Sequence, residues 1–383
     1  MAPIIRPAIS GIGAFMKRTA IVLALVLASA ATVVAPSPAH AQQFPVDTFQ
    51  NILDNAVRAG VPGIVLHVET WDGNIWSGSA GQTETENPQA LTADMPFRLY
   101  TLSKMAVAAL ALDLVDDARL GLDDKIGKWI DPALIANLPY SNEITIRDLV
   151  AETSGIRDYF DQPFVFETRS NAGKKWRPEE LVAHAAKGDA IGAPDRDVSH
   201  ASNTNYVLLG LAIEKAGGAP LATQLRERIF EPLEMTATQS WEEVELPSLV
   251  HGHVPQFLSR VDVGDLDLSM AWGTGDLVSN AADIVRLTRG LFEGRILSST
   301  SRALMSEVFR PLADSEFDVD YGYGTMRFNA IAPAPVGFNA KGAGFGALAA
   351  WWPKTGLIVV VLANLEVDTP LGVLEAVATA LGQ

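Results

Sequence analysis

The spacing of hydrophobic and polar residues predicts both helices and strands near the start of the chain. Apolar residues recur at helical intervals from Phe49 to Ala59, which predicts a helix there. Residues 64–70 and 75–78 are rich in β-forming residues and are joined by an Asp-Gly turn, a pattern typical of a hairpin. Residues 102–115 are apolar nearly all round, as expected for a helix buried in the middle of a protein.

The rest of the chain separates into a helical part and a strand-rich part. The predicted helices lie at 146–152, 178–187, 206–216, 219–230 and 281–292, and the predicted strands at 323–329, 346–352 and 357–364, before a last helix at 371–381. Strands therefore occur at both ends of the chain. The simplest architecture is an α+β fold in which one antiparallel sheet, flanked by helices, is built from both chain ends. We expect residues 44–111 and 271–383 to form this α/β part and residues 112–270 to form an inserted, mainly helical region.

The first 41 residues have the pattern of an export signal. Lys17-Arg18 precedes an apolar run over 19–28, and the segment closes on Ala39-His40-Ala41, an A-x-A cleavage pattern. The apolar run is about half of the roughly 20 residues that a membrane span needs. We predict a signal peptide at 1–41, with Met1 or Met16 as the start, and a periplasmic or secreted protein with no membrane span after cleavage.

Composition excludes several classes of function. The chain carries 29 Lys and Arg against 45 Asp and Glu, a net charge of −16, so it would repel the phosphates of nucleic acid and we expect no such partner. It contains no Cys, which excludes disulfides, thiolate metal sites and a Cys nucleophile.

Six phrases of the sequence, in order and spacing, resemble one family. They are Pro96–Lys104, Leu149–Ile156, Ser202–Gly210, Ile229–Met235, Gly275–Ser279 and Tyr321–Gly324. The second is similar to an L-L-x-H-T-S-G loop and the third to a Y-S-N-x-x-Y-x-L-L-G segment. On these residues the chain is identified as a member of the class C β-lactamase, D-Ala-D-Ala carboxypeptidase and esterase family of penicillin-recognising serine hydrolases. The resemblance implies a β-lactamase/transpeptidase-like fold for residues 42–383.

The resemblance also implies an acyl-enzyme mechanism, but the first catalytic motif is altered. In the family a Ser opens the buried helix and a Lys one turn later, in S-x-x-K, activates its hydroxyl. This chain has Thr101 at the Ser position and keeps Lys104. A Thr hydroxyl is also a nucleophile, although its extra methyl group stiffens the side chain. Ser103 does not substitute, because adjacent helical residues face different directions.

The second motif has lost its phenol. Where the family has Tyr-x-Asn, this chain has Ala201, followed by Ser202 and Asn203. Asn203 is retained as a catalytic candidate, and Ser202 as a substrate-binding candidate. His200 and Tyr100 are neighbours that would compensate only if the fold turned them toward the site; Tyr100 is also counted as a substrate-binding candidate.

Two segments compete for the third motif. Lys354-Thr355-Gly356 is a literal K-T-G, but it lies in the predicted turn after Trp352, and we interpret it as an ordinary turn. The segment that matches by position is Lys341-Gly342-Ala343-Gly344, which we place at the start of the preceding strand. The resemblance implies that Lys341 holds a substrate carboxylate and that the amides of Gly344 and Thr101 form the oxyanion hole. Gly342 and Ala343 would complete this wall.

Weaker patterns add no cofactor and no metal. His251 and His253 flank a glycine, but no third ligand is evident despite nearby Asp residues, so we expect no metal. We also expect no cofactor. Trp351 and Trp352 are neighbours in a predicted strand and should face opposite ways, so that at least one packs between sheet and helix.

The sequence leaves three hypotheses open. The first is an exported hydrolase or transferase that acts on amide or ester bonds through an acyl-Thr101 enzyme, with Lys104 as base. Its substrate would be a D-amino-acid peptide, a β-lactam or a small ester. The second is an inactive enzyme of the same fold that binds a cell-wall peptide or a protein partner. The third is a relic whose cleft is filled by side chains such as those of Tyr100 and Phe345.

Overall fold

The structure, a computed structural model, describes residues 44–244, 250–257, 259–313 and 315–383. The predicted export signal at 1–41 and the choice between Met1 and Met16 lie outside the described residues. Within the described residues, no helix has both the length and the apolar character that a bilayer crossing requires.

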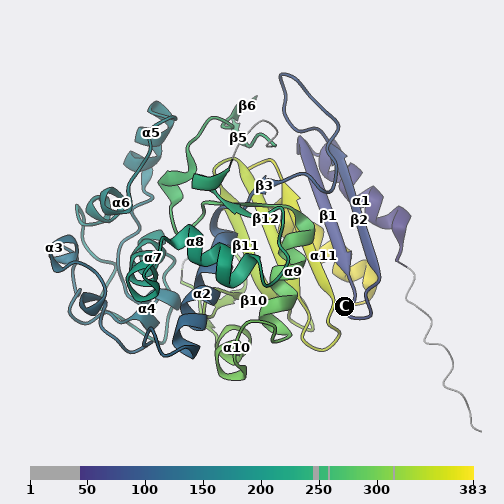
Figure 1. Cartoon of the computed structure of the whole chain (residues 1–383). Coiled ribbons are helices and arrows are strands. Elements are labelled where there is room, and N and C mark those ends of the chain that lie inside the picture. The colour runs from purple at the N-terminus through teal and green to yellow at the C-terminus, as the bar shows by residue number, and fades with distance from the viewer. Residues whose placement is uncertain (1–43, 245–249, 258, 314) are drawn as a thin grey trace, which may run out of the picture. The chain divides into compact units, whose positions relative to one another are not determined.

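Eight antiparallel strands drawn from both ends of the chain form the main sheet (Figure 1). Their order is β2-β1-β13-β12-β11-β10-β9-β8. The bounds are β1 Gly63–Glu69, β2 Ile75–Gly81, β8 Arg310–Pro311, β9 Val319–Tyr321, β10 Met326–Phe328, β11 Val336–Gly342, β12 Phe345–Trp351 and β13 Ile358–Ala363. The N-terminal hairpin pairs with the last strand, so the α+β fold with one sheet from both chain ends is confirmed.

Both faces of the sheet are covered, and the sequence of β13 shows why. Its side chains alternate between two hydrophobic clusters: Ile358, Val360 and Leu362 join one cluster, while Val359 and Val361 join the other. A strand buried on both faces has no reason to carry polar residues, which explains its uninterrupted apolar run.

Two terminal helices cover one face, and a third helix covers the other. Helices α1 (Val46–Arg58) and α11 (Thr369–Leu381) pack on the sheet and on each other. Helix α9 (Ala281–Phe292) packs against β1, β12 and β13 from the opposite side.

The neighbouring tryptophans of β12 and its turn lie on opposite faces of the sheet. Trp351 stacks on Phe292 of α9 with ring centroids 4.6 Å apart, and Trp352 is fully buried in the cluster under α1 and α11. The prediction that at least one packs between sheet and helix is confirmed.

The middle of the chain is mainly helical. Its helices are α2 Lys104–Asp116, α3 Pro132–Ile135, α4 Ile146–Val150, α5 Gln162–Ser170, α6 Pro178–Ala185, α7 Asn203–Gly217 and α8 Leu221–Leu225, with α10 Ser299–Ser306 following α9. Helix α2 packs against α7 and has lost all solvent contact over most of its length, as its apolar sequence predicts. Short strands β3 Phe97–Arg98, β4 Gln239–Ser240 and β7 Leu277–Ser279 form a second sheet, and β5 His253–Gln256 pairs with β6 Ser259–Asp262.

The sequence pattern missed one strand that matters for function. Strand β11 was not predicted. Lys341 and Gly342 lie at its end, so the expectation that they begin the strand before the Lys354-Thr355-Gly356 turn was wrong. Strand β12 begins instead at Phe345. The error has a physical cause: β11 and β12 are joined by the two residues Ala343 and Gly344, and a turn this short leaves no polar segment to mark the boundary.

Candidate active site

A cavity of about 450 Å³ opens between the start of α2, the start of α7 and the end of β11. Seven of the nine residues predicted for the site line this cavity: Tyr100, Thr101, Lys104, Ser202, Asn203, Lys341 and Gly342. Ala343 and Gly344 are not among the lining residues. Segments more than 200 residues apart in the sequence thus meet at one hollow, as the candidate site requires.

Thr101 lies in a short 3₁₀ turn, Tyr100–Ser103, that leads into α2. Tyr100 enters this turn with φ +47°, a left-handed conformation that is uncommon outside glycine and is retained where surrounding contacts enforce it. Ser103 is buried and its hydroxyl accepts a hydrogen bond from the Leu277 amide at 3.3 Å, so it faces away from the cavity wall. This placement agrees with the expectation that Ser103 does not replace Thr101.

Lys104 is held in a buried ion pair. Its ammonium donates to Glu152 Oε1 at 2.6 Å, and the two side chains are 5% and 0% exposed. The ammonium also lies 4.9 Å from the centre of the Tyr206 ring. In the described part of the chain, its hydrogen bond goes to Glu152 and none joins it to the Thr101 hydroxyl. The expected contact between nucleophile and base is therefore replaced by a contact between two opposite charges.

Glu152 is a charged residue of the cavity lining that the sequence analysis missed. Besides Lys104, its carboxylate accepts hydrogen bonds from the Ser202 amide at 2.8 Å and from Asn205 Nδ2 at 2.7 Å. Its backbone has φ +57°, again left-handed. Burial raises the pKa of Glu152 despite the lowering effect of Lys104 and the hydrogen bonds. One signal was available: Glu152 occupies the His position of the L-L-x-H-T-S-G loop that carries the family resemblance.

The second motif, residues 201–203 at the start of α7, has no phenol to fill the position of the family's Tyr. Ala201 is exposed, whereas Ser202 and Asn203 are buried at the start of α7. Asn203 donates from Nδ2 to Asp158 Oδ2 at 3.0 Å. The Ser202 hydroxyl and Asn203 Oδ1 are buried without a hydrogen-bond partner in the described structure. Burial raises the pKa of Asp158, which no sequence pattern pointed to.

Neither neighbour replaces the phenol. His200 is not among the lining residues, and its amide donates to the Glu152 carbonyl at 2.7 Å. Tyr100 does line the cavity, but burial raises its pKa well above the ordinary value, so the phenolate that would accept a proton is disfavoured.

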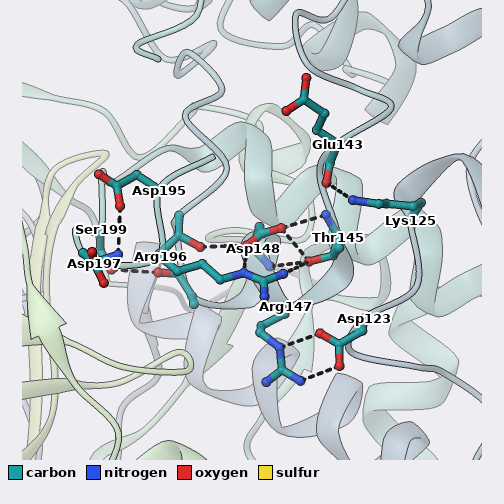
Figure 2. A network of polar contacts seen from close by, with 12 residues as sticks. Asp123, Lys125, Glu143, Thr145, Arg147, Asp148, Asp195, Arg196, Asp197 and Ser199 are labelled. Atoms are coloured by element: carbon teal, nitrogen blue, oxygen red, sulfur yellow. Dashed lines mark hydrogen bonds and ion pairs between the residues drawn. The ribbon is translucent and has the colours of Figure 1, made fainter. Parts of the chain in front are cut away.

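A polar network outside the cavity lining joins Asp148 at the start of α4 to Arg196 in the loop before α7 (Figure 2). Arg196 donates from Nε to Asp148 Oδ1 at 2.9 Å, and Asp148 forms a capping box with Thr145 at the start of α4. Ser199 donates from its hydroxyl to the Ala151 carbonyl at 2.8 Å. The loop before α7 is thereby attached to the end of α4, which sets the position of Glu152 relative to Ser202.

The segment matched to the third motif, residues 341–344 at the end of β11, differs most from the sequence-based expectation. Lys341 donates to Asp368 Oδ2 at 2.8 Å, so its ammonium is already paired. Gly342 lies against Tyr100: a Cβ at this position would come within 2.0 Å of the Tyr100 ring. Ala343 and Gly344, with φ of +49° and +88°, form the turn to β12, and the Gly344 amide donates to Glu366 Oε2 at 3.0 Å. The amide predicted to hold an oxyanion thus already binds a carboxylate of the chain itself.

The weaker patterns have structural explanations. Lys354-Thr355-Gly356 is the turn between β12 and β13, closed by a hydrogen bond from the Gly356 amide to the Trp352 carbonyl, so its interpretation as an ordinary turn is confirmed. His251 pairs with Asp262 at 3.0 Å, and buried His253 contacts the Asn364 carbonyl at 3.1 Å. The described residues contain no group of three or more acidic or His side chains arranged to hold a metal ion.

Comparison with known proteins identifies relatives across nearly the whole described chain. The profile of the family described as Beta-lactamase matches residues 47–383. Penicillin-binding protein 4* of Bacillus subtilis is 26% identical over 323 residues, which cover 80% of this chain and 69% of that protein. Among solved structures, a D-stereospecific amidohydrolase from Streptomyces sp. has a TM-score of 0.77 at 26% identity, covering 86% of this chain and 98% of its own. D-amino acid amidase from Ochrobactrum anthropi SV3, complexed with D-phenylalanine, has a TM-score of 0.78 at 25% identity. The match covers 88% of this chain and 97% of that protein's chain.

Proposed function

This chain belongs to the beta-lactamase family, and we propose that it is a ligand-binding member in which the acylation step of the family has been lost. The ligand is a small molecule or peptide held in the cavity between α2, α7 and β11. The observation that carries the proposal is the buried ion pair between Lys104 and Glu152.

The chemistry behind this observation is simple. A lysine acts as a general base through the lone pair of its neutral amine, which must reach the hydroxyl it deprotonates. An ammonium that donates to a carboxylate at 2.6 Å has no lone pair to offer.

Two further features support loss of turnover. Ala201 provides no second group for proton transfer to the leaving group, a contribution typically worth about 10²–10⁴ in rate. The Gly344 amide is engaged by Glu366 and would have to release that carboxylate before it could hold an oxyanion.

The cavity itself is preserved, which supports binding over a purely structural relic. Its volume of about 450 Å³ lies within the range of small-molecule sites. Phe345 does not fill it, because that side chain is buried elsewhere against Phe97. Tyr100 and Glu152 also keep left-handed backbone conformations at the cavity wall, and such strain persists at functional sites.

A second candidate function is favoured by one observation: Thr101 and Lys104 still line the same cavity. In that case the proton of Lys104 would pass to Glu152, whose pKa is raised by burial. The neutral amine would take the Thr101 hydroxyl proton while the oxygen attacks an amide or ester carbonyl. The amine would then return the proton to the leaving group, and acyl-Thr101 would be hydrolysed by water.

Intact-mass spectrometry separates the two functions. The protein is incubated with benzylpenicillin and, separately, with a p-nitrophenyl ester of an acylated amino acid. The proposal of a binding protein expects no covalent adduct and no product above the level given by Thr101→Ala. A wild-type adduct that disappears in Thr101→Ala would establish the hydrolase instead.

A gain-of-function variant provides the positive control. Combining Thr101→Ser with Ala201→Tyr restores the nucleophile and the phenol, and adding Glu152→His frees the Lys104 amine. We expect an adduct in the triple variant and none in Thr101→Ser alone, because the ion pair persists in the latter.

We also propose export, on the pattern of residues 17–41. Expression in a Gram-negative host followed by fractionation and N-terminal sequencing checks this. The expected mature protein begins at Gln42 in the periplasm, and a full-length chain confined to the cytoplasm contradicts it.

A further inference from the structure

Among the described residues, two carboxylates of the cavity lining remain without an ion-pair partner after the ion pairs of Lys104 and Lys341 are counted. Lys104 is neutralised by Glu152, and Lys341 is paired with Asp368 at 2.8 Å. Asp158 and Glu366 also line the cavity, and neither has an ion-pair partner among the residues that the structure describes. Arg169 is an exposed cation of the lining, at the far end of α5. The lining therefore includes two carboxylates, Asp158 and Glu366, that form no ion pair with a cation of the described residues.

A second, independent observation concerns hydrogen bonds. Asn203 is 9% exposed and Ser202 is fully buried, and both line the cavity. Because Asn203 Nδ2 is bound to Asp158, its Oδ1 is left as an acceptor without a donor. The Ser202 hydroxyl is likewise without a partner in the described structure. Buried acceptors without donors cost free energy, so these groups favour a ligand that brings N–H groups.

Apolar rings complete the surroundings of these acceptors. Tyr100 and Phe160 meet edge to face with centroids 5.9 Å apart, and Phe338 of β11 also lines the cavity. Aromatic faces carry partial negative charge and attract cations as well as apolar groups. An anionic ligand is less favoured, because Lys341, the residue expected to hold a carboxylate, already donates to Asp368.

We propose that the cleft selects a ligand with a protonated amine next to an aromatic or aliphatic body, and that the amine is held by the Asp158 carboxylate and Asn203 Oδ1. This inference rests on the proposed binding function and names the chemical class of its ligand. An ammonium group has three donors and one positive charge, which meets both the charge and the hydrogen-bond demand of the wall. Glu366 is a second carboxylate of the lining, and one of its oxygens accepts the hydrogen bond of the Gly344 amide.

Three probes of nearly equal size test the charge preference by isothermal titration calorimetry. Phenylalaninamide carries an ammonium, N-acetylphenylalaninamide is neutral, and N-acetylphenylalanine carries a carboxylate; each is used as the D and the L form. We expect phenylalaninamide to bind at least about tenfold more tightly than the neutral probe, the effect of one charged hydrogen bond, and the carboxylate probe to bind most weakly.

Variants locate the effect in the wall. Asp158→Asn should weaken phenylalaninamide at least about tenfold and leave the neutral probe within about twofold. Glu167→Gln is the matched control: it removes one negative charge from α5 at a site outside the cavity lining and should change neither affinity. If Asp158→Asn does not fold, the ranking of the three probes on the wild-type protein still decides.

The outcomes separate this inference from the function on which it rests. Equal affinity for the three probes, preference for the carboxylate probe, or no heat from phenylalaninamide at about 10 mM overturns the amine preference. Release of ammonia from phenylalaninamide, followed by mass spectrometry of the same samples, contradicts the proposed loss of turnover and leaves the amine preference standing if the ranking holds.

Discussion

Replacing Lys104 by Met is the sharpest test of whether the ion pair is structural. Met keeps the length and most of the volume of the Lys side chain and removes its charge. Glu152, which has no exposed surface, would then be left as a buried carboxylate with two remaining hydrogen bonds, from the Ser202 amide and Asn205. We expect the variant to be clearly less stable than the wild type.

The size of the loss follows from the geometry. At 2.6 Å and an effective dielectric constant of about 20, the attraction between the two charges is about 6 kcal/mol, and desolvation of each ion opposes it by several kcal/mol. The net value of the pair is therefore small, but removing one partner leaves the desolvation of the other uncompensated. Such losses are about 3–5 kcal/mol.

A double-mutant cycle measured by urea unfolding at pH 7 isolates the pair. Lys104→Met and Glu152→Gln are each made alone and then together. In the double variant no uncompensated charge remains, so we expect its stability to lie within about 1–2 kcal/mol of the wild type and the coupling free energy to reach at least about 2 kcal/mol. The cost of Lys104→Met should also shrink as the pH falls below 7, because Glu152, whose pKa is already raised, then takes up a proton.

The opposite result would refute the reasoning. If Lys104→Met is neutral or stabilising at pH 7 and the two substitutions are additive, Lys104 does not serve the fold. Its amine would then be free for chemistry, as in an active hydrolase, where catalytic residues are commonly retained at a cost to stability.

Three further predictions concern the scaffold and are measured as free energies of unfolding. Asp148→Ala should cost about 2 kcal/mol or more, because it removes a buried cap and the anchor of Arg196, whereas Asp123→Ala at the exposed end of the same network should cost less than about 1 kcal/mol; equal losses would contradict the role of burial. Burial raises the pKa of Asp276 to about 7, above its unfolded value near 3.8, so its contribution to stability is present in acid and is lost as the pH rises through about 7. Asp276→Asn should therefore reduce the fall in stability between pH 4 and pH 8 by up to about 4 kcal/mol, and an unchanged pH profile would count against that pKa. Trp352→Ala should cost about 3–5 kcal/mol, the value for a fully buried aromatic residue, and a loss below about 1 kcal/mol would show that α1 and α11 collapse into the space.

The sequence by itself determined the main helices and strands of the fold, and it revealed the substitutions in the catalytic motifs. Apolar periodicity is a local property, so it predicted the buried helix α2 and the strands β1 and β13. The substitutions at Thr101 and Ala201 are visible in the sequence because the surrounding phrases fix their positions. These observations were enough for the fold, and they indicated that turnover was in doubt.

What the remaining groups do was decided only by the tertiary structure. Glu152 meets Lys104 across 48 residues, and Glu366 meets the Gly344 amide across 22 residues. Lys341 meets Asp368 at a sequence separation of 27 residues. No local period encodes such pairs, because they depend on the directions in which side chains leave loops that are packed together by other contacts. In the sequence alone the same charged residues are indistinguishable from a solvated surface. The tertiary structure buries Glu152 against Lys104, and on our proposal it leaves Asp158 as the site for a cation.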